Sequence, residues 1–123
     1  MRLIIFTYII KKQMSAMVNE VSLDEGHSLP TEKSLQNAAK LSIVEERPIM
    51  MDYWTDSLDK KVMIGVRNDE KKMLIRSEEE YTSYIEKIFR INNKDFIIMT
   101  ENSIYIVDKD IPTKKISFNT EEE

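Results

Sequence analysis

Cysteine is absent from the 123-residue chain, and glycine (two), proline (three) and histidine (one) are scarce. Without cysteine the chain can form no disulfide, thiolate nucleophile or thiolate metal ligand, which suits a reducing intracellular compartment. Phosphate-cradling loops need several glycines. The single His27 lies in a polar segment, so neither a nucleophile with its base nor a histidine metal site is expected. These absences predict a protein that is not an enzyme and uses no cofactor or metal.

The charge balance argues against a general nucleic-acid binder. The chain carries a formal net charge of −4, with 41% hydrophobic and 33% charged residues, a balance typical of a soluble globular domain. Between Glu45 and Val107 ten cationic residues are interleaved with thirteen acidic ones, giving no even basic surface. A nucleic-acid-binding small β-barrel therefore remains the alternative reading, and a protein partner the leading one.

The N-terminal residues differ in character from the rest. The apolar run Leu3–Ile10 is far shorter than the about 20 residues of a membrane-spanning helix. Lys11 and Lys12 follow where a signal peptide would place small residues. Residues 1–13 are therefore expected to form a β-strand or an extension, unless the native protein begins at Met14 or Met17. Residues 14–30 are expected to be a linker.

A short amphipathic helix is predicted at about residues 31–44, at the start of a single β-rich domain spanning 31–118. Thr31 is the expected N-cap, and apolar residues follow at helical spacing. The helix should cover a face of the sheet, or alternatively dock a partner. After Pro48, a strand is expected over Ile49–Trp54, and a turn over Thr55–Lys60.

From Lys61 to Val107, alternating apolar residues separated by polar turns predict an antiparallel meander. One helical turn is expected over Ser77–Tyr81, because serine suits an N-cap and glutamates suit the first turn. An edge strand should follow at about 114–118, and residues 119–123 should be an acidic tail. The fold class is mainly all-β. We expect five or six strands, curled into an SH3-like or partly open barrel.

An acidic cluster before the meander and a glycine within it are candidate functional features. The acidic residues Asp52, Asp56 and Asp59 lack the glycine and the distal glutamate of a calcium loop, so a solvated turn is expected. Gly65 lies alone inside a strand, where a bulge or a close backbone approach would explain it.

Aromatic residues at predicted strand ends are the candidate binding residues. Tyrosine and tryptophan anchor interfaces because they bury a large rigid area and keep a polar tip. Trp54 could equally plug the end of a barrel. The predicted partner-binding residues are Tyr53, Trp54, Tyr81 and Tyr84.

The strand sequences PIMMDYWTDS, KKVMIGV, EEYTSYIEKIF and IIMTENSIYIV resemble small uncharacterised proteins encoded by nucleocytoplasmic large DNA viruses. The resemblance covers about half of the chain and carries over no activity and no functional residue. It implies a virion or virus-factory component rather than a metabolic enzyme. Together with the composition, it predicts a non-enzymatic interaction or structural module inside the cell, with no membrane span.

Overall fold

The structure is a computed structural model that describes residues 28–117. The predicted segment 1–13, most of the predicted linker 14–30, His27 and the acidic tail 119–123 lie outside these residues. The described elements, in chain order, are α2 (Glu32–Glu45), β1 (Ile49–Met50), α3 (Trp54–Leu58), β2 (Met63–Val66), β3 (Lys72–Ile75), β4 (Ile85–Arg90), β5 (Asp95–Thr100), β6 (Ile104–Asp108) and β7 (Thr113–Lys115).

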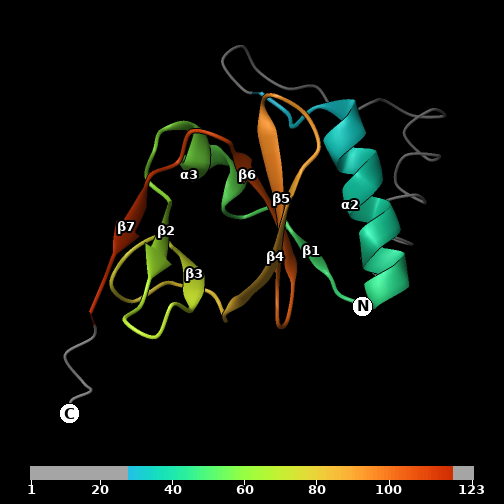
Figure 1. The fold of residues 1–123 in the computed structure, drawn as a ribbon. Helices are drawn as coiled ribbons and strands as arrows, with labels where there is room; N and C mark the ends of the chain where they lie inside the picture. The colour runs from blue at the N-terminus through green and yellow to red at the C-terminus, as the bar shows by residue number, and fades with distance from the viewer. Residues whose placement is uncertain (1–27, 118–123) are drawn as a thin grey trace, which may run out of the picture.

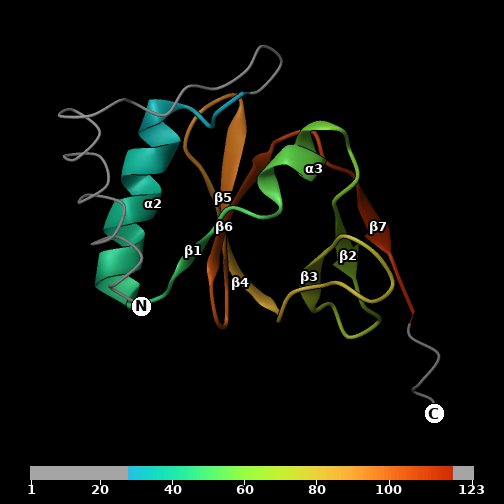
Figure 2. The same cartoon turned by 180° about the vertical axis from the view of Figure 1, so that it is seen from behind.

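The elements form three layers (Figures 1 and 2). A four-stranded sheet in the order β1-β6-β5-β4 lies in the middle. Helix α2 covers one of its faces, and a three-stranded sheet in the order β3-β2-β7 lies on the other side. Alternate residues of β5 and β6 therefore enter two different apolar cores, because successive side chains of a strand point to opposite faces.

The core under α2 contains Ala38 of the helix together with Ile97 and Ile104 of the middle sheet. The core between the sheets contains Ile98, which follows Ile97, and Val107, which follows Ile106 of the core under α2. Burial on both faces explains why β5 and β6 are almost continuously apolar rather than half polar.

Helix α2 begins as the sequence predicts. The Thr31 side chain accepts a hydrogen bond from the Ser34 N–H at 3.2 Å, and the Asn92 amide donates to the same hydroxyl at 2.8 Å. The buried Asp95 carboxylate accepts the Thr31 N–H at 2.8 Å. A carboxylate at this end opposes the positive end of the helix dipole. The cap therefore also ties the helix to the start of β5.

The prediction of a mainly β chain with one leading helix is confirmed, but the pairing is mixed rather than wholly antiparallel. The pairs β2–β3, β4–β5 and β5–β6 are antiparallel, as expected of a meander. In contrast, β1 pairs with β6 and β7 pairs with β2 in parallel. Within residues 28–117 the strands form two separate sheets that are not hydrogen-bonded to each other, so they do not form a closed barrel. The likeness to an SH3 domain stays a prediction.

Two local predictions are wrong. Only Ile49 and Met50 of the expected strand Ile49–Trp54 pair with β6, and the chain then turns into helix α3, which occupies most of the predicted turn. The segment carries bulky residues at successive positions because Tyr53 and Trp54 are buried in two different cores. Such a pattern does not require an extended strand.

The expected helical turn over Ser77–Tyr81 is also absent. The Ser77 hydroxyl does accept the N–H groups of Glu79 and Glu80, at 3.2 Å and 3.1 Å. The chain then runs back along β3, where the Thr82 N–H donates to Leu74 O at 2.9 Å. Pairing with β3 thus replaces the helix that the serine and glutamates alone favour. The last strand is observed at Thr113–Lys115 rather than 114–118.

Candidate functional site

A hollow of about 520 Å³ lies on the outer side of the three-stranded sheet, away from the middle sheet. We call it the outer hollow. It is lined by Lys60, Lys61, Val62, Met63, Ile75, Arg76, Ser77, Glu78, Tyr81, Pro112, Lys114, Ile116 and Ser117.

Strand alternation places apolar side chains on the floor of the outer hollow. Ile64 and Leu74 enter the core between the sheets, so their neighbours Met63 and Ile75, which are paired across β2 and β3, point outward. A Cβ added to Gly65 would overlap Cδ1 of Ile75 and would lie 2.9 Å from Cδ1 of Ile116. The two isoleucines therefore approach each other over the bare backbone of the central strand.

These contacts explain why position 65 is a glycine. The register between β2 and β3 runs without a shift through Gly65 and Met73, so no bulge is present at the glycine. The predicted close backbone approach is not found either, because the nearest atoms belong to the side chains of Ile75 and Ile116. A side chain at position 65 would raise the floor of the hollow.

The rim of the outer hollow is cationic, with four basic side chains and one glutamate. Lys60 and Arg76 are paired with carboxylates. Lys61 and Lys114 are exposed, and neither makes an ion pair with any residue in the described range. These two lysines are the charges of the rim that are available to a ligand.

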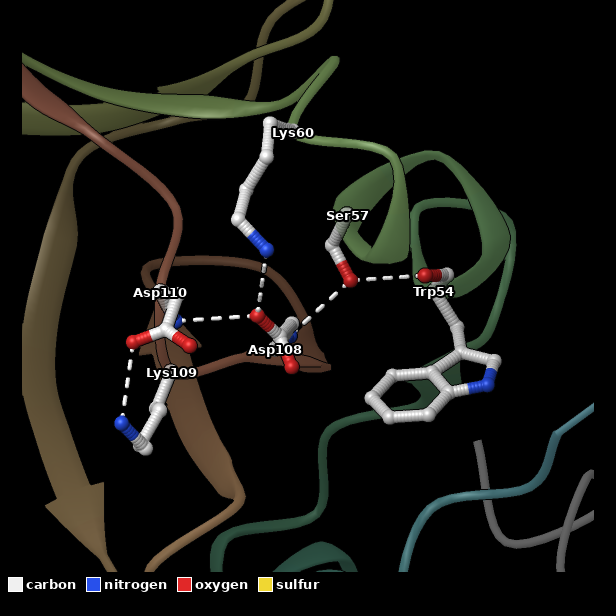
Figure 3. A network of polar contacts seen from close by, with 6 residues as sticks. All are labelled: Trp54, Ser57, Lys60, Asp108, Lys109 and Asp110. Carbon is white, nitrogen blue, oxygen red and sulfur yellow. Dashed lines mark hydrogen bonds and ion pairs between the residues drawn. The ribbon is translucent and has the colours of Figure 1, made fainter.

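Figure 3 shows the contacts that hold Lys60. The Ser57 hydroxyl is fully buried; it donates to Trp54 O at 2.6 Å and accepts the Asp108 N–H at 2.9 Å. The Asp108 carboxylate accepts from Lys60 at 3.2 Å and from the Asp110 N–H at 3.0 Å. These hydrogen bonds connect α3 to the end of β6 and hold Lys60 at the rim of the outer hollow.

Arg76 links the outer hollow to the core between the sheets. Its guanidinium lies 3.3 Å from Asp56 and 3.5 Å from Asp52, and its central carbon lies 5.0 Å from the centroid of the Tyr53 ring. Both aspartates thus pair with an arginine. Around Arg76 the cationic rim is neutralised.

Tyr53 is a buried residue with a perturbed acidity. Burial raises the pKa of Tyr53 to about 12, and the neighbouring Tyr105 adds to this shift while Arg76 opposes it. The two tyrosine rings lie 5.1 Å apart, tilted by 58°. Burial likewise raises the pKa of Tyr105. Both phenols are therefore neutral over the physiological range.

The four predicted binding residues do not form one surface. Tyr53 and Trp54 are 5% and 6% exposed, and they enter the two different cores. The Trp54 indole N–H donates to Ser28 O at 2.8 Å. Tyr81, by contrast, is 49% exposed and stands at the rim of the outer hollow. Of the four, Tyr81 is the residue that the structure brings to this site.

Tyr84 belongs to a second hollow, of about 490 Å³, between β3 and β4. Arg67 donates to its hydroxyl at 2.6 Å, and the Lys71 ammonium lies 4.8 Å from its ring centroid. Glu70, Glu86 and Glu101 also line this hollow, so its cations face carboxylates. It offers less apolar floor than the outer hollow.

Sequence reasoning missed the residues that define the outer hollow, namely Lys61, Lys114 and the floor at Met63, Ile75 and Ile116. The one usable signal was Gly65, whose isolation within a strand indicated a close approach. The parallel pairing of β7 with β2 that brings Lys114 and Ile116 to the site has no local signature.

Residues 28–117 contain no group of three or more histidine, cysteine or acidic side chains placed to hold a metal ion. No helix in this range is long and apolar enough to cross a bilayer. No protein-family model matches the chain, and neither a curated protein nor a solved structure matches it.

Proposed function

We propose that the chain is a non-enzymatic protein-interaction module that binds an extended peptide segment of a partner at the outer hollow. The observation that carries the proposal is the combination of an apolar floor with an open strand edge beside it. Extended peptides bind in this way when they add a strand to a sheet edge and place alternate side chains in pockets.

The open edge belongs to β7. The other edge strand of the three-stranded sheet, β3, is already covered, because Arg76 N–H donates to Glu80 O at 2.8 Å and Thr82 N–H donates to Leu74 O at 2.9 Å. Strand β7 pairs with β2 on one side and has no strand on its other side within the described part of the chain. On the three-stranded sheet, a partner strand therefore has one edge at which to pair, that of β7.

The hydrogen bonds of β7 identify which backbone groups face the partner. Pro112 O accepts the Ile64 N–H at 2.8 Å, and the Ile116 N–H donates to Val66 O at 2.9 Å. Because backbone groups alternate in direction along a strand, the N–H and C=O groups of Thr113 and Lys115 point to the open edge. They supply the main-chain contacts of the proposed complex.

The alternative of a nucleic-acid-binding barrel is less well supported. Stacking of bases needs exposed aromatic faces beside uncompensated cations. Of the predicted aromatic residues, Tyr53 and Trp54 are buried, and Arg76 is surrounded by carboxylates. The same arrangement leaves the apolar floor available to a peptide side chain.

The test is selection of a peptide from an unbiased library of random decapeptides on the immobilised full chain, followed by NMR mapping of a selected peptide. We expect chemical-shift changes at Thr113, Lys115 and Ile116, with few changes around Tyr84. Binding should fall about tenfold or more in the variant Met63→Gln, because an amide would replace part of the apolar floor.

The matched control is Met51→Gln, which changes an exposed methionine away from the outer hollow and should leave binding unchanged. Failure to select any peptide, or shift changes confined to another surface, would refute the proposal. Both variants should first show the native melting temperature within a few degrees.

We also propose a cellular setting, from the resemblance of the strands to proteins of nucleocytoplasmic large DNA viruses. In that setting the module would act inside an infected cell, as part of a virion or a virus factory. Mass spectrometry of purified virions and of isolated factories tests this: peptides of the chain should be enriched there, and their absence from both would contradict it.

A further inference from the structure

We infer that the partner segment of the outer hollow is acidic, with a carboxylate flanked two residues away on each side by apolar side chains. The inference rests on the proposed function and adds the chemistry of the ligand. It follows from the order of side chains along β7 and from the charges left unpaired beside it.

Lys114 stands between two apolar residues on the same face of the chain. Pro112 and Ile116 each lie two positions from it, so all three point to the outer hollow, and all three line it. Lys114 is in register with Gly65 and is exposed. A strand paired with β7 would therefore meet the pattern apolar, cationic, apolar.

Directly opposed side chains on neighbouring strands interact most strongly, and opposite charges are favoured there. A carboxylate opposite Lys114 would gain an ion pair that no described residue supplies. Its neighbours two residues away would contact Pro112 and Ile116. Lys61, on the same face as Met63, would add a second unpaired charge at the end of the hollow.

Charge also excludes a second copy of β7 as the occupant. Strand β7 carries the consecutive lysines Lys114 and Lys115, both exposed. Two such edges side by side would face lysine with lysine, which is a common device against self-association of edge strands. The same two charges favour an acidic strand, so a partner segment with the complementary pattern fits the edge better than a second copy of β7.

The experiment uses the full chain and three fluorescein-labelled heptapeptides, measured by fluorescence anisotropy at low salt. The probe is Thr-Phe-Thr-Glu-Thr-Leu-Thr. The first control replaces its glutamate by glutamine. The second, Thr-Phe-Glu-Thr-Thr-Leu-Thr, has the same composition with the carboxylate moved to the opposite face, and it is compared with the probe on the variant Lys115→Gln because Lys115 lies on that face.

We expect the probe to bind about two- to fivefold more tightly than either control, which is the range for one cross-strand charge pair. The advantage should disappear at 1 M salt, because the pair is exposed and screened. It should also disappear in Lys114→Gln, while Lys87→Gln, an exposed lysine of β4, should keep it.

Equal binding of the three peptides, with NMR shifts still at β7, would overturn the inference and leave the proposed function standing. Absence of all peptide binding, including that of library-selected peptides, would overturn both. Displacement of the probe by a single-stranded oligonucleotide more tightly than by the unlabelled probe would also overturn the inference, because the lysines would then serve a phosphate backbone.

Discussion

Gly65 lies directly beneath Ile75, so closely that a Cβ at position 65 would overlap the isoleucine Cδ1. The contact is made across the paired strands β2 and β3, on the face that carries the outer hollow. The glycine therefore sets the depth of the hollow as well as the packing of its floor.

Replacement of Gly65 by valine should destabilise the protein by about 1–3 kcal/mol, the usual cost of overpacking. The added methyl groups would displace Ile75 and Ile116. Urea denaturation measures the effect. The double variant Gly65→Val with Ile75→Ala should recover part of the loss, since it removes the atoms that are overlapped. Additive losses in the double variant would show that the two sites are not in contact.

The variant Ser57→Ala should cost about 1–3 kcal/mol, because it removes a fully buried hydroxyl and leaves the half-buried Asp108 N–H without its acceptor. Thermal unfolding by circular dichroism gives the change in melting temperature. The exposed neighbour Thr55 provides the control: Thr55→Ala should shift the melting temperature little. Equal effects of the two substitutions would argue against the network in Figure 3.

Loss of the helix cap should be measurable through Thr31→Ala, with an expected cost of about 1 kcal/mol. The variant removes the acceptor of both the Ser34 N–H and the Asn92 amide. Thr31→Ser keeps the hydroxyl and should retain most of the stability. Hydrogen exchange of the first turn of α2 should speed up in the alanine variant alone; unchanged exchange there would contradict the assigned cap.

The raised pKa of Tyr53 predicts a loss of stability in alkali. Because the folded pKa of about 12 exceeds the ordinary value of 10.0, the unfolded chain ionises first. The stability that the neutral phenol contributes below pH 10 is therefore lost as the pH rises toward 12. Urea denaturation between pH 9 and 12 should show a shallower decline for Tyr53→Phe than for the native chain. Parallel curves would refute the assignment.

Local signals account for the parts of the fold that the sequence predicts correctly. Thr31 caps α2 through a residue three positions away, and the hairpin of β2 and β3 joins neighbouring segments. Alternation then identifies β5 and β6. Each of these depends on residues close together in the chain, which is why periodicity and capping rules find them.

The misread parts depend on contacts between distant segments. Ile49 pairs with Ile104, and Thr113 pairs with Ile64, both in parallel and across most of the domain. Tyr53 and Trp54 look like exposed strand-end aromatics until two separate cores bury them. Tyr81 reaches the site because its segment pairs with β3 instead of forming a helical turn. The sequences of these short segments contain no local pattern that predicts which distant strand they pair with.

The pairing of β7 with β2 has a consequence for synthesis on the ribosome. The hairpin of β2 and β3 is synthesised before most of the middle sheet, but its third strand, β7, is made only after the middle sheet is complete. Until then the edge of β2 that β7 will occupy stays unpaired, and the outer hollow lacks Lys114 and Ile116. A nascent chain that lacks β7 would thus carry an exposed strand edge, and the proposed binding site would be complete only after β7 has been made.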